Sequence, residues 1–218
     1  MKLVLTAALS ALLLSAPAFA ETAAPSSAPA SKAGKTDFTK PFVNDRLGKI
    51  PGALSMSDVN LMGSARTPQP SIYVSFRSFA GECPNTLQCA VGVHDTVQGT
   101  GQGSHGSLSR AETRNFMAAV GPSFKKGYAD PAPVSNADIA PTMAKIAGIE
   151  LPAKGKLRGR VISEAFPGGS APSVAKHTIQ SAPAENGART ILNYQQVGDA
   201  RYFDVAGFDG KAVGLTPP

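Results

Sequence analysis

Glycine and proline interrupt this sequence so often that it can fold only into short elements joined by many loops. Gly accounts for 22 and Pro for 18 of the 218 residues, and they follow no fixed period, which excludes a collagen-like fibre. Hydrophobic residues make up 42% and charged residues 17%, which is not the profile of a fully disordered chain. The sequence therefore predicts a globular, loop-rich domain with tails.

The start of the chain has the pattern of an export signal. Lys2 gives a positive charge, Leu3–Leu14 form an apolar stretch, and Ala18–Ala20 supply the small residues that signal peptidase reads. The apolar stretch is shorter than the about 20 residues that a membrane-spanning helix needs, and Pro17 interrupts it. We expect cleavage after Ala20, a periplasmic or secreted protein, and no membrane span in the mature chain.

Composition divides the rest of the chain into a leader and a domain. Residues 21–45 begin with a run rich in Ala, Pro and Ser that has almost nothing to bury, which predicts a disordered leader. Residues 46–218 form the predicted domain. The net charge of +6 comes from scattered Lys and Arg, and no basic run resembles a nucleic-acid-binding arm. Solvated surface charge is the better interpretation of these bases.

The sequence has two cysteines, Cys83 and Cys89. In an oxidising compartment, a closely spaced pair predicts a small disulfide loop. Pro84 and Asn85 supply turn chemistry between the two cysteines. A metal or redox pair is the alternative, but there is no C-x-x-C and no second pair to complete a thiolate site.

Strand-like patterns occur in both halves of the predicted domain. Alternating apolar and polar side chains indicate two half-buried strands, and a compact apolar run indicates a buried strand. In the C-terminal part, turn signals at Asn186-Gly187 and Gly198-Asp199 separate three further segments, which predicts an antiparallel meander. In chain order the segments are 72–77, 89–97, 116–120, 178–181, 190–196 and 201–205.

Two helices are predicted between these strands. Ser109-x-x-Glu112 is a capping box that opens a short helix. Asn136 is placed to cap a second helix with apolar positions at Ile139, Met143 and Ile146, and Gly148 suits the left-handed position that ends it. Strands that alternate with helices before a β-rich end predict a mixed α/β fold.

His105 is the candidate ligand among the three histidines. It lies in the glycine-rich stretch 98–106, where the backbone can approach a ligand closely, and neutral imidazole is a common zinc ligand. From these residues alone, a loop histidine without a function fits slightly better. Ser107, Ser109 and Thr113 are hydroxyls near His105 in the sequence, but no nearby carboxylate orients a nucleophile–base pair, so no catalytic residue is assigned.

Six motifs follow one another between Gly101 and Val161. In chain order they are Gly-Gln-Gly-Ser-His105-Gly-Ser, Arg110, Thr113, Phe116-Met-Ala-Ala-Val-Gly-Pro122-x-Phe124, Ser135-Asn-Ala-Asp138-Ile-Ala-Pro141-Thr142 and Gly159-Arg-Val161. In this order and spacing they resemble the C-terminal part of bacterial type I phosphodiesterases/nucleotide pyrophosphatases, of the alkaline phosphatase superfamily. The flanks 59–79 and 192–207 are similar to the same group, so the resemblance covers most of residues 50–215.

The resemblance implies an α/β sandwich around a large mixed sheet, with two zinc ions at its carboxyl edge. It also implies hydrolysis of phosphoric esters by a Thr or Ser nucleophile, with the metals stabilising both oxygens of an in-line displacement. His105 matches the histidine of the family's late His-Gly and would be a zinc ligand. Asp138, in the Asp-Ile-Ala-Pro-Thr stretch, is better interpreted as structural, accepting N–H groups at the start of a helix.

The sequence departs from the family upstream of His105. Family enzymes carry the nucleophile, the first metal-binding Asp, an Asp-x-x-x-His and an Asp-His-Gly there, whereas residues 21–70 contain no histidine and the only His-Gly is His105-Gly106, after Ser104. One histidine cannot hold two zinc ions, because a catalytic zinc needs about three protein ligands. We therefore expect a partial alkaline-phosphatase-like domain with a mixed sheet and a C-terminal antiparallel meander.

Three hypotheses follow for the function. The chain is part of a phosphodiesterase that works only when the missing groups come from elsewhere, or an inactive exported protein that binds a phosphate ester or a partner, or a zinc-free structural module. A partial sheet would expose an unpaired edge and apolar surface, which favours self-association or a partner chain.

Overall fold

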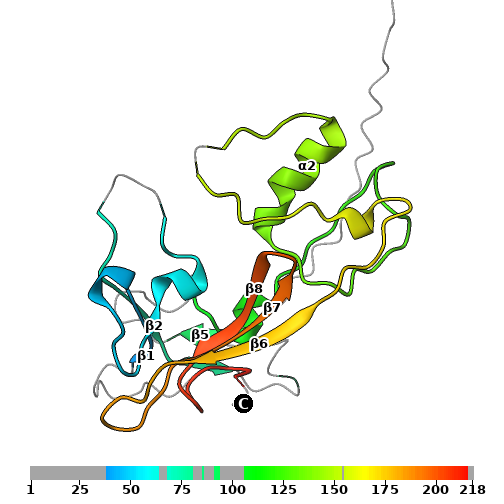
Figure 1. The fold of residues 1–218 in the computed structure, drawn as a ribbon. Helices are drawn as coiled ribbons and strands as arrows, with labels where there is room; N and C mark the ends of the chain where they lie inside the picture. The colour runs from blue at the N-terminus through cyan, green and yellow to red at the C-terminus, as the bar shows by residue number, and fades with distance from the viewer. Residues whose placement is uncertain are drawn as a thin grey trace, which may run out of the picture. The chain divides into compact units, whose positions relative to one another are not determined.

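The computed structural model describes residues 38–63, 68–80, 85, 91–93, 106–153 and 155–215 (Figure 1). All of them belong to one compact unit, Thr36–Pro218. The described residues form short helices, a three-stranded mixed sheet, a two-stranded pair and a three-stranded antiparallel sheet. The expected mixed α/β class is therefore confirmed.

The mixed sheet contains β1 (Phe38–Val43), β2 (Leu54–Ser55) and β3 (Ile72–Phe76), in the order β2-β1-β3. β2 pairs with β1 in parallel and β3 pairs with it in the antiparallel direction. Two 3-10 helices, η1 (Asp45–Leu47) and η2 (Met56–Val59), flank β2. Strand structure thus starts inside the predicted leader 21–45, because its Ala-, Pro- and Ser-rich run ends before the apolar residues of β1.

The alternation predicted over 72–77 is present in β3, but the buried positions are not the aliphatic ones. Ser75 is buried, whereas Ile72 and Val74 are exposed. Pairing with β1 places Tyr73 opposite Phe42, and their rings lie 6.1 Å apart, so this row of the strand faces the core. β4 (Ser78–Ala80) follows at once and pairs with β5 (Val91–Val93), the described part of the predicted strand 89–97.

The predicted C-terminal meander is confirmed (Figure 1). It consists of β6 (Ala175–Gln180), β7 (Ile191–Val197) and β8 (Ala200–Gly207), with β7 in the centre. Gly198 has a φ of 55°, a left-handed conformation that favours glycine in the tight turn between β7 and β8. The register shifts once, between Asn193 and Tyr194.

The two predicted helices are α1 (Arg110–Thr113) and α2 (Ile139–Ala147), and α2 follows the 3-10 turn η3 (Asn136–Asp138). A further 3-10 turn, η4, covers Ser163–Ala165. Ser135, and not the predicted Asn136, caps this region, because its hydroxyl accepts from the N–H of Ala137. Gly148 ends α2 with a φ of 67°, as predicted.

The core forms where the meander meets the mixed sheet. Its buried residues come from β1, β2, η2, β7 and β8: Phe42, Leu54, Met56, Val59, Leu192, Tyr194 and Ala206. The predicted buried strand 116–120 is wrong, since Phe116 is 91% and Val120 99% exposed. Among the described residues no strand pairs with this run, and of its side chains only that of Met117 is partly buried. The described part of the chain contains no helix long and apolar enough to cross a membrane.

Candidate functional site

Four residues that the sequence singles out lie outside the described residues. They are the cleavage position Ala20, the predicted disulfide partners Cys83 and Cys89, and the predicted zinc ligand His105. All four stay predictions. The structure does describe the residues that directly follow His105, beginning with Gly106.

The segment 106–109 is fastened to two strands. Tyr73 of β3 donates its hydroxyl hydrogen to the carbonyl oxygen of Gly106 at 2.5 Å, and the N–H of Ala206 in β8 donates to the carbonyl of Leu108 at 2.8 Å. Burial and the negative charge of Glu112 raise the pKa of Tyr73, so its hydroxyl keeps the proton that this bond needs. Gly106 has a φ of 101°, which a residue with a side chain rarely adopts.

The three hydroxyls near His105 in the sequence all take part in local hydrogen bonds. The Oγ of Ser107 accepts from the N–H of Ser109, and the fully buried Oγ–H of Ser109 donates to the carboxylate of Glu112 at 3.2 Å. Thr113 donates to the carbonyl of Asp204 in β8. The bond from Thr113 holds α1 against β8. Of the three hydroxyls, Ser109 bonds to a carboxylate, but its side chain is fully buried, so it is not placed to attack a substrate.

A zinc site needs several His, Cys, Asp or Glu side chains close together. None of the His, Cys, Asp and Glu side chains in the described ranges gather in a group of three or more that could hold a metal ion. The described residues therefore do not by themselves fit a zinc site. His105 remains the single candidate ligand from the sequence.

The main polar cluster of the described residues surrounds Arg160, which the sequence analysis did not single out as a site. Its guanidinium donates to both carboxylate oxygens of Glu164, at 2.6 and 2.8 Å, and to the carbonyl of Pro133 at 3.1 Å. The side chains of Arg160 and Glu164 are 15% and 1% exposed. A bidentate hydrogen-bonded pair between an arginine and a carboxylate is among the strongest polar contacts in proteins.

Asp138 and Tyr202 extend this cluster. The carboxylate of Asp138 accepts from the N–H of Ser135 at 2.8 Å, from the N–H of Arg160 at 2.8 Å and from the hydroxyl of Tyr202 at 3.0 Å. The same hydroxyl accepts from Nε of Arg160 at 2.8 Å. Asp138 thus accepts an N–H at the start of η3, as its sequence position predicts, and it also binds Arg160 and Tyr202, which are distant in the chain.

The ionisation of the cluster follows from these contacts. Burial opposes the charge on both Arg160 and Glu164, but their mutual hydrogen bonds prevail, so the pKa of Arg160 is raised and the pKa of Glu164 is lowered. Burial and the charge of Asp138 raise the pKa of Tyr202. The pair stays charged and the phenol stays neutral, which is the state that the hydrogen bonds require.

Asp130 lies near the Arg160–Glu164 pair. Its Oδ1 accepts from the N–H of Ala132 at 2.9 Å, whereas its Oδ2 is buried without a hydrogen-bond partner among the described residues. Burial and the nearby carboxylate of Glu164 raise the pKa of Asp130. A buried oxygen beside a carboxylate favours the protonated form of Asp130.

Sequence periodicity gives no signal for this cluster, because its members come from segments far apart in the chain. Its acceptors and donors bind one another, which makes the cluster a brace between loops rather than a reactive centre.

No protein-family model, curated protein or solved structure matches this chain.

Proposed function

We propose that this chain is part of an exported, metal-dependent phosphoric-ester hydrolase of the alkaline phosphatase type, with His105 as a zinc ligand. The proposal depends on the ordered motifs between Gly101 and Val161 and on their spacing. One structural observation carries it: the segment that follows His105 is held at both Gly106 and Leu108 by strands of two different sheets.

A ligand loop needs this kind of support. A metal site requires its ligands to be held within a fraction of an ångström by the residues around them. The bond from Tyr73 fixes the peptide between Gly106 and Ser107, and the bond from Ala206 fixes the chain two residues further on. Both bonds use main-chain atoms of the loop, so they hold its path without occupying a side chain.

We further propose that the chain does not complete a hydrolytic site alone. A catalytic zinc needs about three protein ligands, and the sequence offers one histidine in the family's pattern. The remaining ligands and the nucleophile would then come from a partner chain, which also brings the phosphate ester. The proposed location is the periplasm or the exterior, where Cys83 and Cys89 would form their disulfide.

Zinc binding by the full chain tests this proposal. Isothermal titration of the chain with zinc chloride should show binding that His105→Ala removes and that His177→Ala keeps. His177 is the matched control, because it is an exposed histidine on β6 that stacks on Tyr194. Equal binding by the chain and the His105→Ala variant contradicts the ligand assignment.

Hydrolysis of a bis-aryl phosphodiester, with zinc and with chelator, tests the second part. We expect no turnover by the folded chain above the rate of the His105→Ala variant. Zinc-dependent turnover that the variant loses would show that the chain completes the site itself.

An inactive binding or structural module is the second candidate. The observation that favours it is the Arg160 cluster, whose groups satisfy one another and leave no free nucleophile. This candidate predicts a folded chain whose melting temperature does not change with zinc.

A further inference from the structure

β6 has a free edge. Among the residues that the structure describes, it is an outer strand of the sheet β6-β7-β8 and pairs with β7 alone. The N–H of Ser181 donates to Thr190, which makes 181–190 a hydrogen-bonded pair of the ladder. Because such pairs alternate with non-bonded ones in an antiparallel ladder, Gln180, Thr178 and Lys176 direct their main-chain N–H and C=O groups away from β7.

The free edge faces the loop before β2. Ala182 lies two residues after Gln180, so its main-chain groups also point away from β7. Its carbonyl accepts from the N–H of Gly52 at 2.8 Å. The buried hydroxyl of Thr190 also donates to the carbonyl of Gly52, at 2.7 Å. These two bonds join the ends of β2 and β6, and β2 is itself the outer strand of the mixed sheet.

A groove of about 550 Å³ opens between the two edges. Its apolar walls come from both sheets and the loop before β2: Val43, Ile50, Pro51, Leu54 and Ile179. Gln180, one of the three outward residues of β6, also lines it. Within the described ranges the outward main-chain groups of β6 have no partner and lie beside apolar side-chain sites, which is the combination that binds an extended peptide as an added strand.

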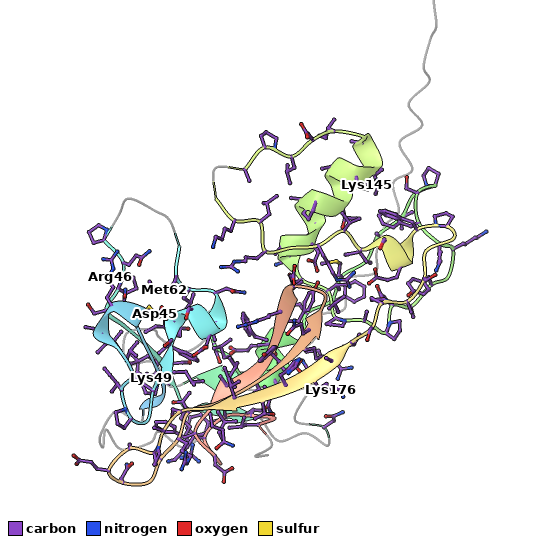
Figure 2. All side chains as sticks on the ribbon, viewed as in Figure 1. Asp45, Arg46, Lys49, Met62, Lys145 and Lys176 are labelled. Atoms are coloured by element: carbon purple, nitrogen blue, oxygen red, sulfur yellow. The ribbon has the colours of Figure 1, made fainter. Side chains whose placement is uncertain are left out.

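The charges around the groove favour an acidic occupant. Lys49 lines the groove and Lys176 stands at the far end of β6 (Figure 2), and neither forms an ion pair with any residue in the described ranges. Asp58 also lines it and accepts from the N–H of Ser55 at 2.9 Å, so two lysines stand against one carboxylate along the groove and β6. A second copy is disfavoured, because each chain carries a net charge of +6 and two copies repel one another.

We propose that β6 and this groove bind an extended, acidic segment of a partner protein, which pairs with the free edge of β6. Its main chain bonds to Lys176, Thr178 and Gln180, its apolar side chains enter the groove, and its carboxylates approach Lys49 and Lys176. Three outward residues at every second position accommodate a strand of about five residues.

Fluorescence anisotropy with a labelled hexapeptide of alternating Glu and Val tests the charge part. The full chain should bind this peptide and should not bind a peptide of alternating Lys and Val. The Lys49→Glu/Lys176→Glu variant should bind about tenfold more weakly or worse. Lys126→Glu/Lys145→Glu is the matched control, because it changes the net charge equally at exposed lysines away from the groove.

The main-chain part has its own test. Thr178→Pro removes one outward N–H but no main-chain bond to β7, so it should abolish peptide binding. It also removes the hydrogen bond from the Thr178 hydroxyl to Asn193 of β7, and Thr178→Ala, which loses that bond and keeps the N–H, is the matched control. A hexapeptide N-methylated at alternate amides should also fail to bind the unchanged chain, which makes this result independent of how the variant folds.

Three results would overturn the proposal. The first is equal binding of the acidic and basic peptides, the second is undiminished binding of the N-methylated peptide, and the third is equal affinity of the two double variants. Sedimentation that shows a dimer which Thr178→Pro dissociates would also overturn it, since a second copy would then occupy the edge.

Discussion

Tyr202 donates a hydrogen bond to Asp138 at 3.0 Å and accepts one from Nε of Arg160 at 2.8 Å. The three residues belong to β8, to η3 and to the segment before η4. One phenol therefore joins the meander to both loops that flank α2.

Removing this hydroxyl tests the brace. Tyr202→Phe leaves Nε of Arg160 unpaired and takes one donor from Asp138, so we expect the free energy of unfolding to fall by about 1–3 kcal/mol. Urea titration measures it. Tyr128→Phe is the control, because the hydroxyl of Tyr128 lies 3.4 Å from Asp130 and is only half-buried. A similar decrease in the free energy of unfolding in both variants would mean that the hydrogen bonds of Tyr202 contribute no more than the contact of Tyr128.

Glu164→Gln tests the buried ion pair. It leaves the charge of Arg160 without its counter-ion, which should cost about 3–5 kcal/mol of unfolding free energy. Because the pKa of Glu164 is lower in the folded chain, its contribution is present above the unfolded value near 4 and is lost as the pH falls through the folded value. Urea midpoints between pH 3 and pH 7 should show this loss in the unchanged chain and in the exposed control Glu150→Gln, but not in Glu164→Gln.

Asp130→Asn should stabilise the chain at neutral pH. The folded pKa of Asp130 is raised, so its favourable contribution is present below the unfolded value near 4 and is lost as the pH rises. Asn keeps the shape, carries no charge and places an N–H donor toward Glu164. The urea midpoint of the variant should exceed that of the unchanged chain at pH 7 and match it at pH 3. A gain of equal size at both pH values, or the same gain in the exposed control Asp209→Asn, would point to a different cause.

Gly159→Ala should destabilise the chain more than Gly148→Ala. A Cβ at residue 159 would overlap the carbonyl of Ala137, which is main chain and cannot move aside cheaply. Residue 148 has open space around it, and its cost is only that of a left-handed φ, about 1 kcal/mol. Thermal unfolding followed by circular dichroism gives the order of the two variants. The reverse order would show that the loop at 159 relaxes.

Phe116→Ser should change the unfolding free energy by no more than about 0.5 kcal/mol, because the ring is 91% exposed. Leu192→Ala removes a fully buried core side chain and should cost about 2–5 kcal/mol. Urea titration of both variants compares the two sites. A large loss in Phe116→Ser would mean that residues 116–120 pack as the strand that their sequence predicts.

The sequence predicts local structure well wherever neighbours along the chain decide it. The turns at Asn186-Gly187 and Gly198-Asp199 and the alternation around them are sufficient to predict the meander. Gly148 similarly marks the end of α2. These features depend on contacts within a few residues, which is the range that periodicity and turn chemistry report.

Features that depend on distant neighbours were not predictable. The apolar run 116–120 is typical of a buried strand, yet burial depends on which other strand is there to cover it. Arg160 has an ordinary sequence context, and only the fold brings it to Tyr202 and Asp138. At the candidate site, the resemblance predicts His105 as a ligand, and only the structure shows the bonds from Tyr73 and Ala206 to Gly106 and Leu108.

The large sequence separation between the residues of the core also determines when the core can form during synthesis. Phe42 and Leu54 pack in the same cluster as Leu192, Tyr194 and Ala206, about 150 positions later. Ribosomes add about 5–20 residues per second, so the amino-terminal strands wait on the order of ten seconds for their packing partners. During synthesis this core cannot close until β7 and β8 have been made, and until then Phe42 and Leu54 lack their final neighbours.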